Sequence, residues 1–484
     1  MQPQLRILTD ELVPKIIDEA FQLMVNPGIK VQLEEARGLL ADAGAKVDEK
    51  REVVQIPEEV ARKALETVPH EFYLYNQDGE SSVHYGGDSV HFDPGSSGVN
   101  VLDSETMQHR PATTHDLIKV IKIAESLWQY DAQSTALVCS EVHNEISDLY
   151  RLYLVLLFSK KPVVTGAFSA KNTNLMIDML AIFAGGRDAL AQKPTAVFDV
   201  CPSPPLIWSQ FGSQSLLDLA RAGIPAQIVS MPLAGAAAPI TLLGSVVQHA
   251  AECISGMTIH QLAKPGAPIV WGGAPAIMDM RHGTTPMGAI ETAMIDAAYA
   301  QVGKSFGFPT HAYMGASDAK VVDYQAGLES STTAMIGALA GINMISGAGM
   351  LDFLACVSLE KLVIDAEAIG MAKRMLKGMQ VHTDPLAADM YAGIDFKGEF
   401  LKQRLTRQLL KEEQYMPSAV IDRGSMRAWQ EMGETDTFAR AQTRVQSLLD
   451  AYTPPDLPLE QVTELKQMVA ALAKEAGMDR LPEF

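Results

Sequence analysis

Aromatic and acidic side chains stand at or just after several short apolar runs of the sequence, where buried strands are expected to end. Asp199 lies in the run 196–201, Tyr313 ends the run 310–313, and Asp318 follows soon after. Aromatic ring faces attract a quaternary ammonium, which cannot donate hydrogen bonds, and a carboxylate adds complementary charge. The pattern predicts a site for a small organic cation, although each aromatic could instead pack in the core. The candidates are Phe198, Asp199, Trp208, Phe211, Trp271, Tyr313 and Asp318.

Basic residues near the same runs could bind the other end of a zwitterion. Arg281 and His282 follow the run 269–271, and Lys320 follows Tyr313. The planar fork of an arginine suits a carboxylate. Arg281 and His282 are therefore the leading candidates to bind the carboxylate of a betaine, with Lys320 competing for the role. The alternative is that Arg281 and His282 form a solvated pair on a loop.

Two other kinds of site are weaker. His249 and Cys253 stand four residues apart on an expected helix, which suits two metal ligands. A catalytic zinc needs three protein ligands, and no third follows at motif spacing, so no metal site is expected. Cys201 follows an expected strand but has no histidine paired with it in the sequence, so a buried thiol is favoured over a nucleophile.

These candidates must be positioned by elements that alternate along the chain. From about residue 132, short apolar runs alternate with longer helical patterns, which is typical of a parallel sheet covered on both faces. Eight such units in about 240 residues fit a (β/α)₈ TIM barrel, with an open doubly wound sheet as the alternative. No glycine-rich phosphate loop occurs, which favours the barrel. The expected strands are 135–139, 162–167, 196–201, 226–230, 269–271, 310–313, 342–346 and, least clearly, 351–357.

The expected organisation is an α/β protein in three parts. Residues 1–130 form an N-terminal α+β layer of helices and a small meander, with strands at 72–75, 82–85 and 90–93. Residues 131–376 form the TIM-barrel core. Residues 377–484 form a helical C-terminal extension that wraps the barrel or builds a subunit interface, so a homo-oligomer is expected. Its predicted helices are 397–413, 437–451 and 459–475.

Composition narrows the class of protein. The chain has 484 residues, 39 Lys+Arg against 58 Asp+Glu, and a net charge of −19, which argues against nucleic-acid binding. Its four cysteines are widely spaced, and its N-terminus has no apolar signal segment, so a cytoplasmic location is expected. The uncharged run 330–351 is long enough for a membrane span, but its four glycines favour a buried helix, a strand and a loop.

Several ordered motifs resemble the corrinoid-dependent methyltransferases typified by trimethylamine methyltransferase. They cover about residues 5–450 and include Asn26-Pro-Gly-Ile-Lys-Val, Arg110-Pro-Ala-Thr-Thr-His-Asp-Leu, Pro232-Leu-Ala-Gly-Ala-Ala-Ala-Pro with Gln248 and Glu252 following, Gly272-Gly-Ala-Pro-Ala-Ile-Met-Asp-Met-Arg, and Gly315-Ala-Ser-Asp-Ala-Lys-Val-Val-Asp. The resemblance implies a TIM barrel whose mouth docks a cobalamin-carrying partner protein, to which a methyl group passes from an amine. It also adds Glu252 to the candidate substrate-binding residues.

The founding members of this family contain pyrrolysine, whereas this chain shows only standard residues. Members without pyrrolysine resemble demethylases of quaternary amines such as glycine betaine, proline betaine, carnitine or γ-butyrobetaine. A quaternary ammonium is already activated, because displacement at its methyl carbon releases a neutral amine.

No catalytic side chain and no tightly bound cofactor are therefore expected, since cob(I)alamin on the partner is the nucleophile and the barrel mainly positions the substrate. A carboxylate tight against the nitrogen would stabilise the ground state more than the transition state. Aromatic rings are thus expected close to nitrogen, with Asp199 or Asp318 acting at a distance or on loop structure. The alternatives are another barrel enzyme for a small cationic or amino-acid-like substrate, perhaps with a metal, and a non-catalytic betaine-binding protein.

Overall fold

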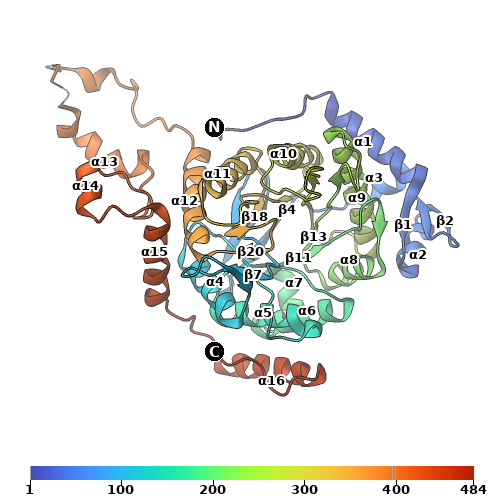
Figure 1. Ribbon diagram of the computed structural model, residues 1–484. Coiled ribbons are helices and arrows are strands. Elements are labelled where there is room, and N and C mark those ends of the chain that lie inside the picture. Colours follow the sequence, from blue (N-terminus) through green and yellow to red (C-terminus); the bar gives the residue numbers. More distant parts are fainter. Residues whose placement is uncertain (1, 395, 398) are drawn as a thin grey trace.

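Eight parallel strands form a near-closed barrel at the centre of the computed structural model, which describes residues 2–394, 396–397 and 399–484 (Figure 1). The sheet order is β6-β18-β17-β15-β13-β11-β10-β9. At the seam between the first and last strands, the backbone N–H of Asp131 donates to the carbonyl of Phe92 at 2.8 Å. The strands are β6 (His91–Pro94), β9 (Gln133–Ser134), β10 (Val163–Thr165), β11 (Ala196–Val200), β13 (Ala226–Ile228), β15 (Ile269–Gly273), β17 (Thr310–Tyr313) and β18 (Met344–Ala348).

A ring of helices surrounds these strands, one long helix after each, as Figure 1 shows. This βα repeat confirms the predicted TIM barrel. Local sequence fixes where helices begin: the Thr113 side chain accepts from the backbone of Asp116, whose carboxylate accepts from Thr113 N, a reciprocal cap that starts α4. The helices are α4 (Thr114–Ser126), α5 (Ser147–Phe158), α6 (Ala170–Ala184), α8 (Gln210–Ala222), α9 (Leu242–Ala263), α10 (Ile290–Ser305), α11 (Tyr324–Leu339) and α12 (Leu359–Leu376), with the short α7 (Arg187–Gln192) after α6.

Two expected strands were wrongly placed. The run 351–357 is not in the barrel, but folds as a hairpin of β19 (Met350–Leu351) and β20 (Cys356–Val357) above it. The run 135–139 lies just beyond β9, which is only Gln133–Ser134.

The eighth barrel strand is β6, which was expected in the N-terminal meander. Its sequence, His-Phe-Asp-Pro, turns Phe92 toward the helices and Asp93 into the barrel, so it lacks the doubly apolar pattern of a buried strand. The barrel core therefore extends N-terminal to residue 131.

The N-terminal segment supplies a cover for one side of the barrel and a plug for its amino end. Its elements are α1 (Leu12–Leu23), a π-helical turn (Met24–Gly28), β1 (Ile29–Val31), α2 (Glu34–Asp42), β2 (Lys46–Asp48), β3 (Val53–Gln55) and α3 (Glu58–Leu65). Helices α1 and α3 pack on α9, and β1 pairs with β12 (Ile207–Trp208). The predicted hairpin is β4 (Glu71–Tyr75) and β5 (Ser81–Gly86), whose Leu74, Val83 and Tyr85 pack against Ala132, Val164, Val197, Val270 and Met344 at the amino end of the barrel.

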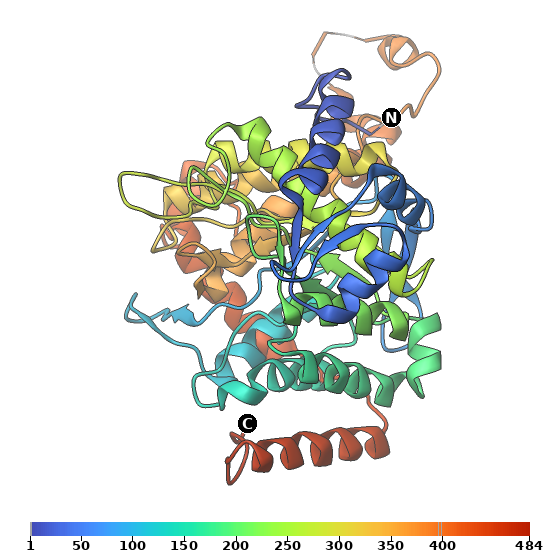
Figure 2. The ribbon, with the colours of Figure 1, turned by 90° about the vertical axis from the view of Figure 1, so that its right-hand side faces the viewer.

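A second small sheet lies at the opposite, carboxyl end. There β20 pairs with β7 (Asn100–Leu102), and β7 pairs with β8 (His109–Pro111). The loops after the strands gather on this side, which faces left in Figure 2. Two of them pair as β14 (Leu233–Ala234) and β16 (Ala276–Ile277).

The C-terminal extension wraps the barrel in part and projects from it in part (Figures 1 and 2). Helix α15 (Thr437–Ala451) packs on α12 and α4, and α16 (Leu459–Glu475) packs on α5 and α6. Both have the predicted bounds. Of the predicted helix 397–413, only α13 (Arg404–Glu413) is α-helical, after a 3₁₀ turn at Glu399–Lys402; residue 398 lies outside the described residues. The short α14 (Met426–Glu431) follows.

The run 330–351 contains the end of α11 and then β18, as predicted. Over the described residues, no helix combines the length and the apolar character that a membrane span requires.

Candidate functional site

The inward-facing side chains of the barrel change character from one end to the other. Above the apolar layer at the hairpin lies a polar layer, where the interior of such a barrel usually holds branched aliphatic residues. Buried polar groups are costly unless they are hydrogen-bonded, so a polar layer points to a function at this height. Its members are Asp93, Asp199, Gln227, His311 and Ser346, with Tyr313 above them.

Asp199 is the centre of this layer. Its carboxylate accepts hydrogen bonds from Gln227 Nε2 at 2.7 Å and from the Tyr313 hydroxyl at 2.8 Å. Tyr313 Oη lies 2.9 Å from Ser96 Oγ, on the loop after β6. Asp199 makes no ion pair with any residue in the described part of the chain, and burial raises its pKa to about 6. The charge of buried Arg151 acts on Asp199 without a direct ion pair, and a partly accessible carboxylate of this kind is suited to attract a cation.

Apolar side chains surround the Tyr313 ring at the carboxyl ends of the strands, which we call the barrel mouth. Val229, Ala276 and Met287 cluster with Tyr313, and Leu233, Ala274 and Leu354 pack against them. The site thus combines an acidic group with an apolar, partly aromatic wall. This is the composition expected for binding an ammonium that carries methyl groups.

A second polar group lies beside Asp199. Ser346 Oγ donates to Asp93 Oδ1 at 2.5 Å, and His311 Nε2 lies 3.0 Å from the same hydroxyl. Burial raises the pKa of Asp93 and lowers that of His311 to about 3. The His311 ring is therefore uncharged near neutral pH, and burial disfavours the charged form of Asp93.

Three of the predicted aromatic residues do not face the mouth. Trp208 is fully buried and donates its indole N–H to Ser255 Oγ on α9 at 3.0 Å. Trp271 donates to the carbonyl of Tyr299 on α10 at 3.0 Å. Phe198 alternates with Asp199 on β11 and so also points to the helix layer. The prediction that these three rings contact the substrate was wrong, because each packs between helices and sheet.

Phe211 lies in the first turn of α8, where its side chain is 38% exposed. It forms no ring contact with another aromatic residue in the described ranges. Of the aromatic residues named from the sequence, only Tyr313 joins Asp199.

The predicted carboxylate-binding residues lie away from Asp199. Arg281 pairs with Asp279 at 2.6 Å and its side chain is 81% exposed, and His282 Nδ1 lies 3.5 Å from the same carboxylate. Arg281 and His282 therefore match the alternative interpretation, a pair of exposed residues on a loop. Lys320 is 3.0 Å from the Asp352 carboxylate and stands 3.8 Å above the ring of Phe353.

The remaining acidic candidates hold loops together. Glu252, on α9, accepts from Leu206 N at 3.0 Å and from Ser230 Oγ at 2.6 Å, which ties the loop after β11 to the end of β13. Asp318 accepts from the backbone N–H of Met287 at 2.8 Å and of Gly288 at 3.0 Å. The carboxylates of Asp318 and Glu252 therefore both accept hydrogen bonds that connect loops at the mouth.

Sequence reasoning missed Phe168 and Arg151. Phe168 follows β10, is 47% exposed, and its ring centroid lies 4.6 Å from the Arg151 guanidinium carbon. Arg151 is fully buried on α5 and donates from Nη1 to Ser97 Oγ at 3.0 Å and to the Thr135 carbonyl at 2.9 Å. A detectable signal existed in the sequence, since Arg151 is the one basic residue of α5, in which most residues are apolar.

No metal site was found among the residues that the structure describes: no group of three or more His, Cys, Asp or Glu side chains is arranged to hold an ion. Cys253 Sγ lies 3.8 Å from the His249 ring nitrogens, inside the helix layer. Cys201 is exposed, so the expectation of a buried thiol was wrong.

Fold and site together define a TIM-barrel protein with an acidic, apolar-walled mouth. The family model for trimethylamine methyltransferase (MTTB) matches residues 1–477, and the chain belongs to this family. It is 30% identical over 477 residues to a glycine betaine methyltransferase from Desulfitobacterium hafniense, covering 98% of both chains. It is 29% identical over 472 residues to a trimethylamine methyltransferase from the same species, covering 98% of this chain and 95% of the relative.

Among solved structures, the monomethylamine methyltransferase of Methanosarcina barkeri is similar, with a TM-score of 0.52 at 14% identity, covering 97% of this chain and 88% of that one. This likeness supports the fold. The family membership makes the protein an enzyme, a methyltransferase of the corrinoid-dependent class that acts on methylamines and betaines.

Proposed function

We propose that this enzyme transfers a methyl group from a quaternary amine, a betaine such as glycine betaine, proline betaine, carnitine or γ-butyrobetaine, to cob(I)alamin on a separate corrinoid protein. The observation that carries the proposal is Asp199, a partly accessible carboxylate with no ion pair in the described residues, set beneath the apolar wall around Tyr313. The similarity to a glycine betaine methyltransferase and the absence of a non-standard residue favour a quaternary over a tertiary amine.

The chain's own residues bind and orient the substrate. Hydrogen bonds from Gln227 and Tyr313 spread the negative charge of Asp199, so that it attracts the cation without pairing tightly with nitrogen. This matters because the positive charge disappears in the transition state, and a tight pair would slow the reaction. The corrinoid supplies the nucleophile. Exposed apolar side chains on the loops around the mouth (Met231, Ile240 and Met280) suit contact with a protein partner.

The first test is methylation of cob(I)alamin by the purified enzyme, followed by the absorbance change from Co(I) to methyl-Co(III). The betaines named above and trimethylamine are compared, with and without a corrinoid protein. Activity with a betaine and none with trimethylamine is expected. If the enzyme methylates cob(I)alamin with none of the amines, even when a corrinoid protein is present, the proposal is contradicted. Stoichiometric zinc in the purified protein would favour a different barrel enzyme.

The proposal includes the compartment in which the enzyme works. All four cysteines are free thiols, which agrees with the cytoplasmic location that we propose.

A further inference from the structure

The turn between β19 and β20 has an unfavourable backbone. Asp352, Phe353 and Leu354 have φ angles of 49°, 55° and 70°, so three successive residues with side chains are left-handed. Only glycine adopts this conformation readily, because a Cβ atom clashes with the following carbonyl. Such a turn persists only when its surroundings hold it, and strained backbone of this kind is concentrated at functional sites.

Contacts from the neighbouring loop hold the turn from outside. Lys320, on the loop after β17, pairs with Asp352 at 3.0 Å and covers the Phe353 ring at 3.8 Å. Beside it, Asp352 N donates to the Ala319 carbonyl at 3.0 Å. The Lys320 ammonium also donates to the backbone carbonyl of Asp318 at 2.7 Å. Lys320 is therefore bound both to its own loop and to the turn.

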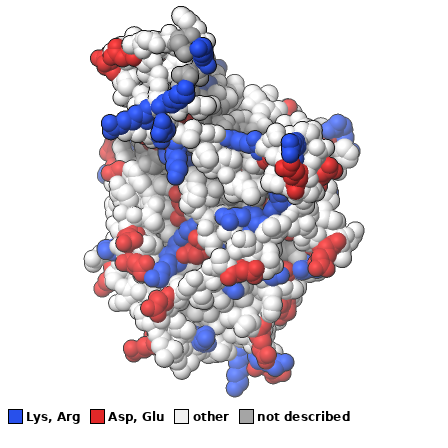
Figure 3. Space-filling model, turned by 90° about the vertical axis from the view of Figure 1, so that its left-hand side faces the viewer, with Lys and Arg blue, Asp and Glu red and all other residues white. Residues whose placement is uncertain are grey.

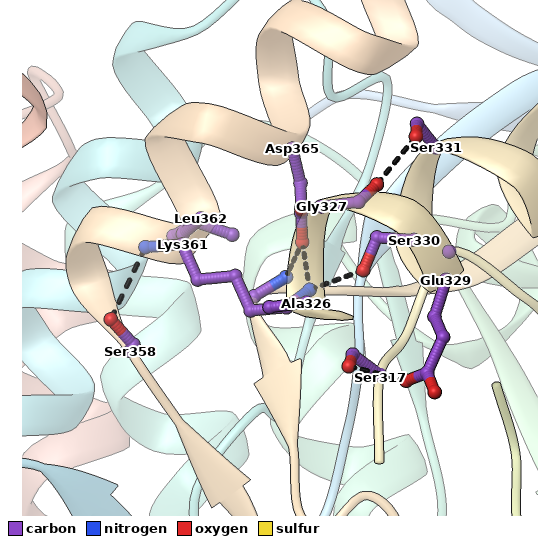
Figure 4. Close-up of polar contacts among 12 residues, drawn as sticks. Ser317, Ala326, Gly327, Glu329, Ser330, Ser331, Ser358, Lys361, Leu362 and Asp365 are labelled. Atoms are coloured by element: carbon purple, nitrogen blue, oxygen red, sulfur yellow. Dashed lines mark hydrogen bonds and ion pairs between the residues drawn. The ribbon is translucent and has the colours of Figure 1, made fainter. Parts of the chain in front are cut away.

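Buried polar groups fix the start of the hairpin from below (Figure 4). Asp365, on α12, accepts from Gly349 N at 2.8 Å, between β18 and β19. Lys361 pairs with Asp365 at 2.6 Å and also donates to Ser330 Oγ on α11 at 2.6 Å. Because this pair is fully desolvated, the hairpin has little freedom to move where it leaves the barrel.

The turn is aimed at the mouth. Leu354 packs against the cluster that contains Tyr313, and the Tyr313 hydroxyl donates to Asp199. An aliphatic side chain carried on strained backbone therefore packs on the apolar cluster that contains Tyr313, the residue that donates to Asp199.

We propose that the turn Asp352–Leu354 is a wall of the substrate site that selects quaternary amines by the size of their tail, and that Lys320 positions this wall. The inference rests on the proposed function. Betaines share an N-methyl head and differ in the chain that carries the carboxylate, so a wall beside the head limits which tail fits. Apolar contacts of this kind discriminate by about tenfold or more for each added methylene.

The test is the ratio of kcat/KM for carnitine to that for glycine betaine. Leu354→Ala is expected to raise this ratio about tenfold, and Leu354→Phe is expected to lower it. Leu459→Ala, at an exposed leucine that begins α16, is the control and keeps the wild-type ratio. Wild-type ratios in both Leu354 variants, with unchanged Tm, would overturn the proposal. If the wild-type enzyme demethylates no amine, it is the proposed function that has failed.

Lys320 is tested as a positioning residue. Lys320→Met removes the ion pair and the charge over Phe353, and we expect the ratio to move toward that of Leu354→Ala, while Lys320→Arg restores the wild-type ratio. Phe353→Gly relieves the left-handed strain, so its Tm is expected to hold or rise while selectivity falls. Lys320→Met with wild-type selectivity, or Phe353→Gly with lower Tm and intact selectivity, would show that these contacts are structural only.

Discussion

Asp199 links substrate binding to protein stability at the scale of one residue. Burial raises its pKa from 3.8 to about 6, so the folded chain holds the proton more tightly than the unfolded chain does. The folded state consequently loses stability as the pH rises from 3.8 toward 6, and the whole cost, about 3 kcal/mol, is present above pH 6.

Asp199→Asn removes this ionisation. We expect the variant to have a higher Tm than the wild type above about pH 6 and a similar Tm below about pH 4, in thermal unfolding followed across pH. The same variant should bind a quaternary amine more weakly, because the attracting charge is gone. In the wild type, KM for the amine should rise as the pH falls below about 6. An Asn variant with unchanged KM would remove Asp199 from the cation site.

At the scale of one element, helix α9 makes room for the buried indole ring of Trp208. A Cβ at Gly256 would lie 2.2 Å from Trp208 Cζ2, closer than any real contact. Gly256→Ala is expected to destabilise the protein by about 1–3 kcal/mol through overpacking. Gly38, in α2, has open space around its Cβ position. Gly38→Ala is therefore the matched control and should stabilise by about 0.5–1 kcal/mol. Denaturation midpoints of both variants check this, and a neutral Gly256→Ala would contradict the packing described here.

The elements with the clearest sequence pattern were predicted well, and the exceptions have a common cause. Strand β15, with the sequence Ile-Val-Trp-Gly-Gly, is buried along its whole length and has no charged residue, so its run stands out in the sequence. The strand β6 contains Asp93 and β9 has only two residues, so neither carries that pattern.

The same reasoning limits prediction of the site. Asp199 and Tyr313 were named because of their residue types and lie together in the structure, whereas Trp208 and Trp271 have suitable types and point to the opposite side. Which side chains face the interior depends on strand register, and sequence alone left that register open. Phe168 directly follows the expected strand 162–167, so its position could have been noticed in the sequence.

The projecting part of the C-terminal extension determines what the whole molecule can assemble into. The side chains of Met379, Phe396 and Leu401 are 98%, 92% and 83% exposed, in a segment that leaves the barrel (Figure 1). In Figure 3 this projecting part, at the top, carries both blue and red side chains. We propose that its exposed apolar side chains pack on a second copy of the chain.

Light scattering during size exclusion is expected to show an oligomer, and Phe396→Ser with Leu401→Ser should shift it toward the monomer, because they remove apolar contact area. Leu459→Ser, equally exposed on α16, is the control. A wild-type monomer would contradict the proposal, as would an oligomer that the double variant leaves intact.

The β4–β5 hairpin has a consequence for the order of events in turnover. It fills the amino end of the barrel, so Asp199 is reached from the carboxyl end. For the methyl transfer proposed above, the amine and the partner's corrinoid then share one entrance. The amine must enter before the partner docks, and the demethylated product leaves only after the partner has departed. Turnover is thereby a compulsory-order cycle, in which the lifetime of the protein–protein complex limits the exchange of small molecules.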